Sequence, residues 1–120
     1  MPIVVLGFAA ARMGDRQRAM QFDLAGLANH PDDPMLNFAI GNILLTADPA
    51  AAAQRYAIAI RGLPAEAKFR NNYGVALVKL GHKMEAAEAF RAAIELAPGW
   101  QDPINNLKKA TVDAPDGPRD

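Results

Sequence analysis

The sequence predicts an all-α fold, a right-handed α-solenoid of three helical hairpins followed by a C-terminal capping helix. Alanine, the strongest helix former, occupies 25 of the 120 positions. Glycine and proline recur at intervals of 33 or 34 residues, at Gly7, Gly41, Gly74 and at Pro31, Pro64, Pro98. A repeat of this length indicates stacked helical hairpins, because one hairpin cannot bury its apolar face alone.

Each predicted helix is bounded by residues that favour starting or stopping one. We expect seven helices, at residues 2–13, 16–29, 34–46, 49–62, 66–80, 84–97 and 102–112. An N-cap acceptor precedes a proline at the first helical position in Asp33-Pro34, Asp48-Pro49 and Asp102-Pro103. Gly14 and Gly81 follow helix-length apolar runs and suit a left-handed C-terminal cap. The hairpins should then span residues 1–33, 34–65 and 66–99, with a capping helix at 102–112 and a flexible tail at 113–120.

Small and aromatic residues recur at matching places in the hairpins. Gly41 and Gly74 lie in apolar runs of the first helices, and Tyr56 and Phe90 occupy equivalent positions in the second helices. We expect each glycine to let two helices approach closely, with the aromatic ring filling the space beside it. In the first hairpin, Asp23 stands at the matching place. We also expect four methionines to fill gaps in the core, namely Met13, Met20, Met35 and Met84.

The composition argues against catalysis and against several classes of ligand. The chain has no cysteine, no serine and two threonines, and its two histidines stand alone in predicted turns. We therefore expect no enzyme activity, no metal site and no cofactor. Thirteen basic residues balance thirteen acidic ones, which disfavours nucleic acid as a partner. The longest apolar run, at residues 1–11, is about half of a bilayer-spanning helix, so we expect a cytoplasmic protein without membrane insertion.

The third hairpin carries the most complete pattern. It runs from Asn72-Tyr73-Gly74-Val75-Ala76-Leu77-Val78-Lys79-Leu80-Gly81 through Ala86, Phe90 and Ala93 to Pro98. This segment resembles a complete tetratricopeptide repeat (TPR). The two preceding hairpins are similar but degraded, so the resemblance covers residues 1–112. Lys108 and Lys109 stand where a fourth repeat would have a small packing residue, and such polar residues suit a capping helix.

The resemblance implies a non-enzymatic adaptor that binds a peptide or helix of another protein in a concave groove lined by the first helix of each hairpin. Its implied groove residues are Val4, Phe8, Arg12, Phe38, Asn42, Lys68, Asn71, Asn72, Val75, Lys79 and Asn106. Two alternatives remain open: a bacterial secretion or assembly helper that acts as a holdase-type chaperone, and the interaction domain of a larger protein.

Two binding modes of the family can be compared with these positions. Chaperone-binding members hold a terminal carboxylate with a set of lysines, asparagines and an arginine. This chain matches that set only at Lys68. Other members hydrogen-bond an extended peptide through a ladder of asparagines, for which Asn72 and Asn106 could be two rungs. The alternative is that these asparagines are solvated or bond locally at helix starts.

Two further features point to partners. The segment at residues 1–11 is apolar on every side, as a helix buried all round would be. We expect self-association, as a homodimer, or partner binding at an edge made of Ile3, Val4, Val5 and Phe8, unless a preceding repeat covers it. The third hairpin is locally basic at Lys68, Arg70, Lys79 and Lys83, which is either a solvated face or a recognition site for an acidic partner.

Overall fold

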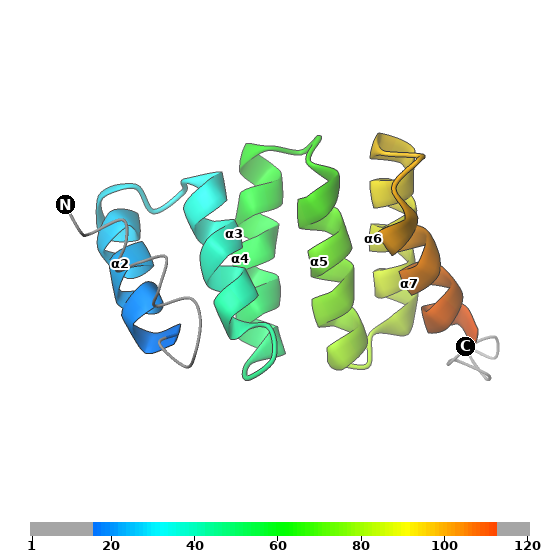
Figure 1. The fold of residues 1–120 in the computed structure, drawn as a ribbon, viewed down its shortest axis with the longest axis horizontal. Coiled ribbons are helices and arrows are strands. Elements are labelled where there is room, and N and C mark those ends of the chain that lie inside the picture. The colour runs from blue at the N-terminus through cyan, green and yellow to red at the C-terminus, as the bar shows by residue number, and fades with distance from the viewer. Residues whose placement is uncertain (1–15, 113–120) are drawn as a thin grey trace.

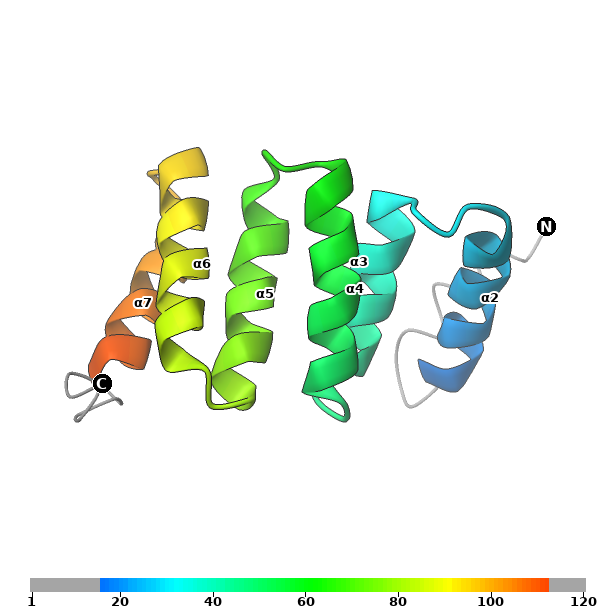
Figure 2. The ribbon, with the colours of Figure 1, turned by 180° about the vertical axis from the view of Figure 1, so that it is seen from behind.

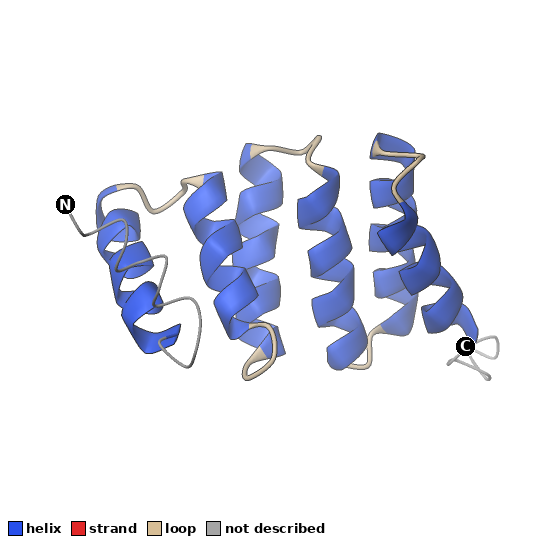
Figure 3. Ribbon diagram, in the orientation of Figure 1, coloured by secondary structure: helices blue, strands red, loops and turns tan. Residues whose placement is uncertain are grey.

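The computed structural model describes residues 16–112, and within them the chain is helical without any strand (Figure 3). The six helices of this part are α2 (Arg16–Asn29), α3 (Pro34–Leu44), α4 (Pro49–Gly62), α5 (Ala67–Lys79), α6 (Lys83–Leu96) and α7 (Gln101–Val112). Each begins and ends within two residues of its prediction. The helix predicted at 2–13, the cap at Gly14, Met13 and the tail at 113–120 lie outside the described residues.

The helices stack side by side as a solenoid of hairpins (Figure 1). The α3–α4 and α5–α6 pairs form the most extensive contacts, and α4–α5, α6–α7 and α2–α3 contacts join them into one row. In Figure 1, α3 and α7 lie in front of α4 and α6, and Figure 2 shows the reverse from behind. The first helices of successive hairpins therefore share one side of the solenoid. No helix between residues 16 and 112 is long and apolar enough to cross a membrane.

Two of the three predicted Asp-Pro caps are confirmed. The Asp33 carboxylate accepts a hydrogen bond from the Leu36 amide at 3.0 Å, and the Asp48 carboxylate accepts one from the Ala51 amide at 3.1 Å. The predicted cap at Asp102 is wrong, because α7 begins one residue earlier and Asp102 lies in its first turn. Proline is tolerated at any of the first helical positions, where the amide groups have no partner within the helix, so Pro103 does not fix the helix start.

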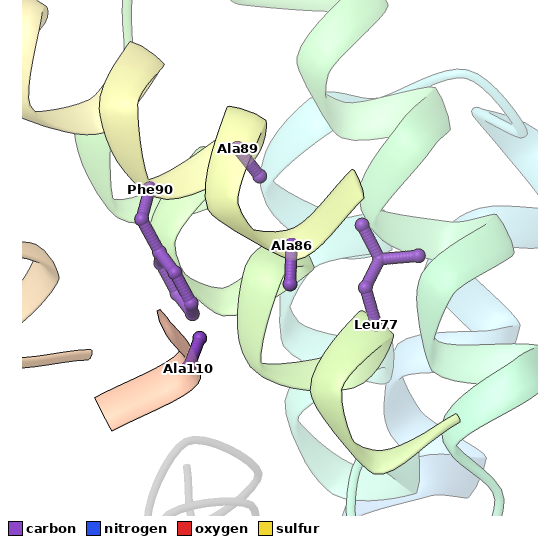
Figure 4. Close-up of a cluster of buried hydrophobic side chains, with 5 residues drawn as sticks. All are labelled: Leu77, Ala86, Ala89, Phe90 and Ala110. Atoms are coloured by element: carbon purple, nitrogen blue, oxygen red, sulfur yellow. The ribbon is translucent and has the colours of Figure 1, made fainter. Parts of the chain in front are cut away.

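The glycine and aromatic positions pack as predicted. A Cβ atom added at Gly41 would lie 2.6 Å from Tyr56 Cε1, and one added at Gly74 would lie 2.5 Å from Phe90 Cε1. Ala86, Ala89 and Ala110 complete the buried cluster around Phe90 with Leu77 (Figure 4). Gly81 closes the turn between α5 and α6 with a φ of +84°, as the sequence predicts for a left-handed cap.

The prediction that Met35 and Met84 fill the core is wrong, because these side chains are 56% and 63% exposed. Each is the second residue of its helix, and successive helical residues are turned by about 100°. In α3 the first buried side chain after Met35 is that of Asn37, which is fully buried. In α6 the buried positions that follow Met84 begin with Ala86 and Ala87. The methionines are therefore turned toward solvent.

Buried Asn37 ties the connection between α2 and α3 to the second hairpin. Its Nδ2 donates to the carbonyl oxygens of Pro31 at 3.0 Å and Asp33 at 2.9 Å. Its Oδ1 accepts a hydrogen bond from the Arg55 guanidinium of α4 at 3.2 Å. A fully buried amide is stable here because both its donor and its acceptor are paired.

Candidate binding face

The candidate site is the side of the solenoid formed by α3, α5 and α7, which we call the first-helix face. Of the expected groove residues, the structure places Phe38 and Asn42 on α3, Lys68, Asn71, Asn72, Val75 and Lys79 on α5, and Asn106 on α7. Val4, Phe8 and Arg12 lie outside the described residues, as do Ile3 and Val5 of the expected self-association edge.

Hydrogen bonds join α3 to α5 through the side-chain oxygen of Asn42. Asn42 Oδ1 accepts from the Tyr56 hydroxyl at 2.7 Å and from Asn72 Nδ2 at 2.8 Å. These two bonds occupy both lone pairs of the oxygen, so the amide of Asn42 is held in one orientation. The Asn42 side chain is nevertheless exposed, with its NH₂ group still available as a donor.

A second pair of hydrogen bonds extends this chain of amides to α7. Asn106 Nδ2 donates to Asn71 Oδ1 at 3.0 Å, and Asn71 Nδ2 reaches Asn72 Oδ1 at 3.5 Å. Asn71 is only 6% exposed, whereas Asn72 and Asn106 are half-buried. We call Asn42, Asn72, Asn71 and Asn106 the amide network. It links three helices, which differs from local bonding at helix starts.

Tyr56 anchors the network from beneath, through a hydroxyl that stays neutral. Burial raises the pKa of Tyr56 to about 12, against a smaller lowering by a hydrogen bond with the Asn72 side chain. The hydroxyl is therefore a hydrogen-bond donor at any physiological pH. The sequence predicts Tyr56 only as a packing ring, although the contrast with Phe90 at the equivalent position was a usable signal. The residue that follows the glycine changes together with the aromatic residue. Asn42 accepts a hydrogen bond from Tyr56, whereas Val75 follows the glycine in the hairpin that contains Phe90.

Aromatic rings brace the same face between α3 and α5. The Phe38 ring lies 4.6 Å from the Phe69 ring and 5.7 Å from the Tyr56 ring, measured between centroids. Phe69 and Tyr56 are buried, and Phe38 is half-buried. The tilted contacts are of a kind that stabilises aromatic pairs, so Phe38 presents a fixed apolar edge.

A cavity of about 220 Å³ lies between α5, α6 and α7. Its apolar lining consists of Val75, Val78, Phe90 and Ala110. Its polar lining consists of Lys79, Lys83, Asn106 and Lys109. The structure thus brings Val75, Lys79 and Asn106, which are predicted groove residues, together at one cavity. Lys68 is exposed and does not line it.

The acidic side chains of α6 lie elsewhere. Glu85 and Glu88 line a separate hollow with Arg70 of α5, and no residue of α7 lines it. His82 Nδ1 lies 3.2 Å from Glu85 Oε1, across one turn at the start of α6. In residues 16–112 no group of three or more histidine, aspartate or glutamate side chains is placed to hold a metal ion.

Comparison with known proteins relates the chain to a repeat family. No protein-family model matches it. A TPR repeat-containing protein of Pseudomonas aeruginosa is 33% identical over 97 residues, which cover 80% of this chain and 39% of that protein. The chain therefore spans about two fifths of the length of this relative.

Solved structures share the architecture of this chain. The first TPR domain of Spaghetti (RPAP3), bound to the HSP90 peptide SRMEEVD, superposes with a TM-score of 0.84 at 20% identity, covering 89% of this chain and 86% of that one. A MamA RS-1 variant superposes with a TM-score of 0.85 at 25% identity, covering 96% of this chain and 65% of that one. The chain thus has the fold of a tetratricopeptide-repeat domain, and its sequence is similar to that of a TPR repeat-containing protein.

Proposed function

We propose that the protein is a non-enzymatic adaptor that holds a peptide segment or helix of another protein on the first-helix face. The observation that carries this proposal is the amide network, which crosses α3, α5 and α7 and ends at the cavity lined by Asn106. Such an arrangement offers oriented polar groups beside an apolar hollow, which is the usual composition of a recognition site.

The amides suit an uncharged partner backbone. An asparagine side chain can both donate and accept, and it carries no charge that would have to be desolvated on binding. The hydrogen bond that Asn72 Nδ2 donates to Asn42 Oδ1 fixes the positions of these groups before a partner arrives. Pre-organisation of this kind lowers the entropy lost on binding.

The HSP90 peptide of the RPAP3 structure is not the ligand we propose. Only Lys68 matches the residue set with which chaperone-binding members of the family hold a terminal carboxylate, and Ala39 and Asn72 stand at two of the other positions. We propose instead that the amide network contacts the backbone of an extended segment.

Affinity capture with matched variants tests the proposal. An Asn72→Ala, Phe38→Ala double variant removes one amide and one ring from the first-helix face, and Gln54→Ala on α4 is the control because that side chain is exposed on the second helix of a hairpin. Circular dichroism must first show that both variants are folded. The double variant should lose a protein that the wild type and the control both capture. Equal capture by all three would contradict the proposal.

The alternative of an interaction domain within a larger protein is favoured by the relative, of which this chain spans only 39%. If this alternative holds, the capture experiment should recover a protein that binds the larger protein, and this binding should require the first-helix face. Self-association at the edge of Ile3, Val4, Val5 and Phe8 remains a separate prediction. A clean monomer in light scattering, together with unchanged solubility and binding of Val4→Glu, would contradict it.

A further inference from the structure

We propose that the amide network has a direction, so that it presents a hydrogen-bond donor, Asn42 Nδ2, at its α3 end and an acceptor, Asn106 Oδ1, at its α7 end. The partner segment therefore places a backbone carbonyl oxygen at Asn42 and a backbone N–H group at Asn106. This inference rests on the proposed function, because it names the groups by which the first-helix face selects the segment that it holds.

All hydrogen bonds between the amides run the same way. Asn106 Nδ2 donates to Asn71 Oδ1 at 3.0 Å. Asn71 Nδ2 reaches Asn72 Oδ1 at 3.5 Å, and Asn72 Nδ2 donates to Asn42 Oδ1 at 2.8 Å. Each inner amide thus uses its NH₂ group toward α3 and its oxygen toward α7. An NH₂ group is left at the α3 end of the network and an oxygen at the α7 end.

The groups at both ends are available to a partner. Asn42 is exposed, and its Nδ2 donates to no other group in residues 16–112. Asn106 is half-buried, and its side chain lines the cavity between α5, α6 and α7. Inside the same described part of the chain, nothing donates to its Oδ1. The first-helix face therefore offers two different polar groups, one at each end of a row of fixed amides.

The direction belongs to the network as a whole. Turning over one inner amide alone would bring two NH₂ groups or two oxygens together, so the amides can reverse only as a set. The Tyr56 hydroxyl holds the observed direction, because it donates to Asn42 Oδ1 at 2.7 Å, the shortest hydrogen bond of the group. After a reversal this hydroxyl would face the NH₂ group of Asn42. Its own hydrogen would then need another acceptor in a fully buried position, where an unpaired donor is costly.

A peptide backbone carries both of the groups that the network requires. Every residue except proline supplies one carbonyl oxygen and one N–H group. Proline lacks the N–H group, so the partner tolerates proline where its carbonyl meets Asn42 and not where its backbone meets Asn106. The two ends of the network together fix the register of the partner segment on the first-helix face.

Aspartate substitutions measure the direction without a partner, because a carboxylate only accepts hydrogen bonds. Asn42→Asp keeps both bonds accepted at that position, whereas Asn106→Asp places an oxygen against Asn71 Oδ1. In urea unfolding of the full chain at pH 7, the midpoint of Asn106→Asp should lie at least about 0.5 M below that of Asn42→Asp. Equal midpoints, or the opposite order, would overturn the proposal.

The added negative charge does not produce the expected order. Position 42 lies in the last turn of α3, where the helix dipole disfavours a negative charge. Position 106 is three residues before Lys109 on α7, where a carboxylate gains a favourable neighbour. Both effects would make Asn42→Asp the less stable variant, so a lower midpoint for Asn106→Asp reports the hydrogen bonds.

Capture from the source lysate tests the donor at Asn42. Asn42→Asp should retain at least about fivefold less of the protein that the wild type captures, because an oxygen would face the partner's carbonyl. Gln54→Glu adds the same charge at an exposed position of α4 and should retain as much as the wild type. Full retention by Asn42→Asp, with loss by the Asn72→Ala, Phe38→Ala variant, would overturn the directional donor and leave the adaptor standing. Full retention by every variant would contradict the adaptor itself.

Discussion

Replacing Gly74 with alanine adds a methyl group where α5 meets the Phe90 ring of α6. The added Cβ would lie 2.5 Å from Cε1, 2.8 Å from Cδ1 and 2.9 Å from Cζ of Phe90. Carbon atoms pack favourably at about 3.5–4.0 Å, so the ring would have to retreat by about 1 Å. Phe90 is 1% exposed and packed against Ala86 and Ala110, so a retreat into the cavity that it lines would weaken these contacts.

The net cost follows from two opposing effects. Alanine is a better helix former than glycine by about 1 kcal/mol, which favours the variant. Overpacking a core costs about 1–3 kcal/mol, and three contacts shorter than 3.0 Å to one buried ring place Gly74→Ala at the upper end. We therefore expect the free energy of unfolding to fall by about 2 kcal/mol.

Urea unfolding followed by circular dichroism measures this change. Gly99→Ala is the matched control, because a Cβ at Gly99 meets no atom within 4 Å, and we expect its unfolding free energy to stay within about 0.5 kcal/mol of the wild type. Adding Phe90→Leu to Gly74→Ala should cost less than the sum of the two single changes. A Gly74→Ala variant as stable as the wild type would refute the close approach of α5 and α6.

Three further changes test other contacts. Asp48→Ala removes the cap on the Ala51 amide and should lower the unfolding free energy by about 1 kcal/mol, measured as a lower thermal midpoint; an unchanged midpoint would contradict the cap. Asn37→Ala leaves buried polar groups unpaired and should cost about 1–3 kcal/mol in urea unfolding, more than the exposed change Gln54→Ala. For Tyr56, whose pKa is raised to about 12, stability should be complete below about pH 10 and fall as pH rises from about 10 to 12, because the unfolded chain loses the proton first. Tyr56→Phe should lack this part of the alkaline loss.

Helix positions were predictable where a local signal marks them. Asp33 and Asp48 cap their helices through contacts within three residues. Gly81 adopts a positive φ, which residues other than glycine rarely adopt. The start of α7 lacked such a signal, since Pro103 is compatible with several first positions of a helix. A local sequence signal thus predicts where a helix begins or ends only when it excludes a boundary at the neighbouring residues.

The contact between the two helices of a hairpin was predictable in kind, because glycine and aromatic residues repeat together. The period places Gly41 opposite Tyr56 and Gly74 opposite Phe90, and the packing distances agree. The orientation of Met35 and Met84 was not predictable in this way, because methionine is found both in cores and at surfaces. Their exposure depends on which neighbours take the inward positions.

The composition of the candidate site was easier to predict than its bonding. The spacing of Asn72 and Asn106 placed both on first helices, but a sequence does not say which amide atom meets which partner. The bond from Asn72 to Asn42 joins residues 30 positions apart and depends on the approach of two hairpins. The cavity likewise requires Lys79, Lys83 and Lys109 to converge from three helices.

Site-specific photo-crosslinking in the source cells tests the adaptor role of the first-helix face most directly. A photoreactive residue at position 68 of α5 leaves the amide network and the cavity intact, because Lys68 belongs to neither. The same residue at position 54 of α4 is the control on the second helix of a hairpin. We predict that a partner protein crosslinks from position 68 and not from position 54. A partner that crosslinks only from position 54 would contradict binding on the first-helix face.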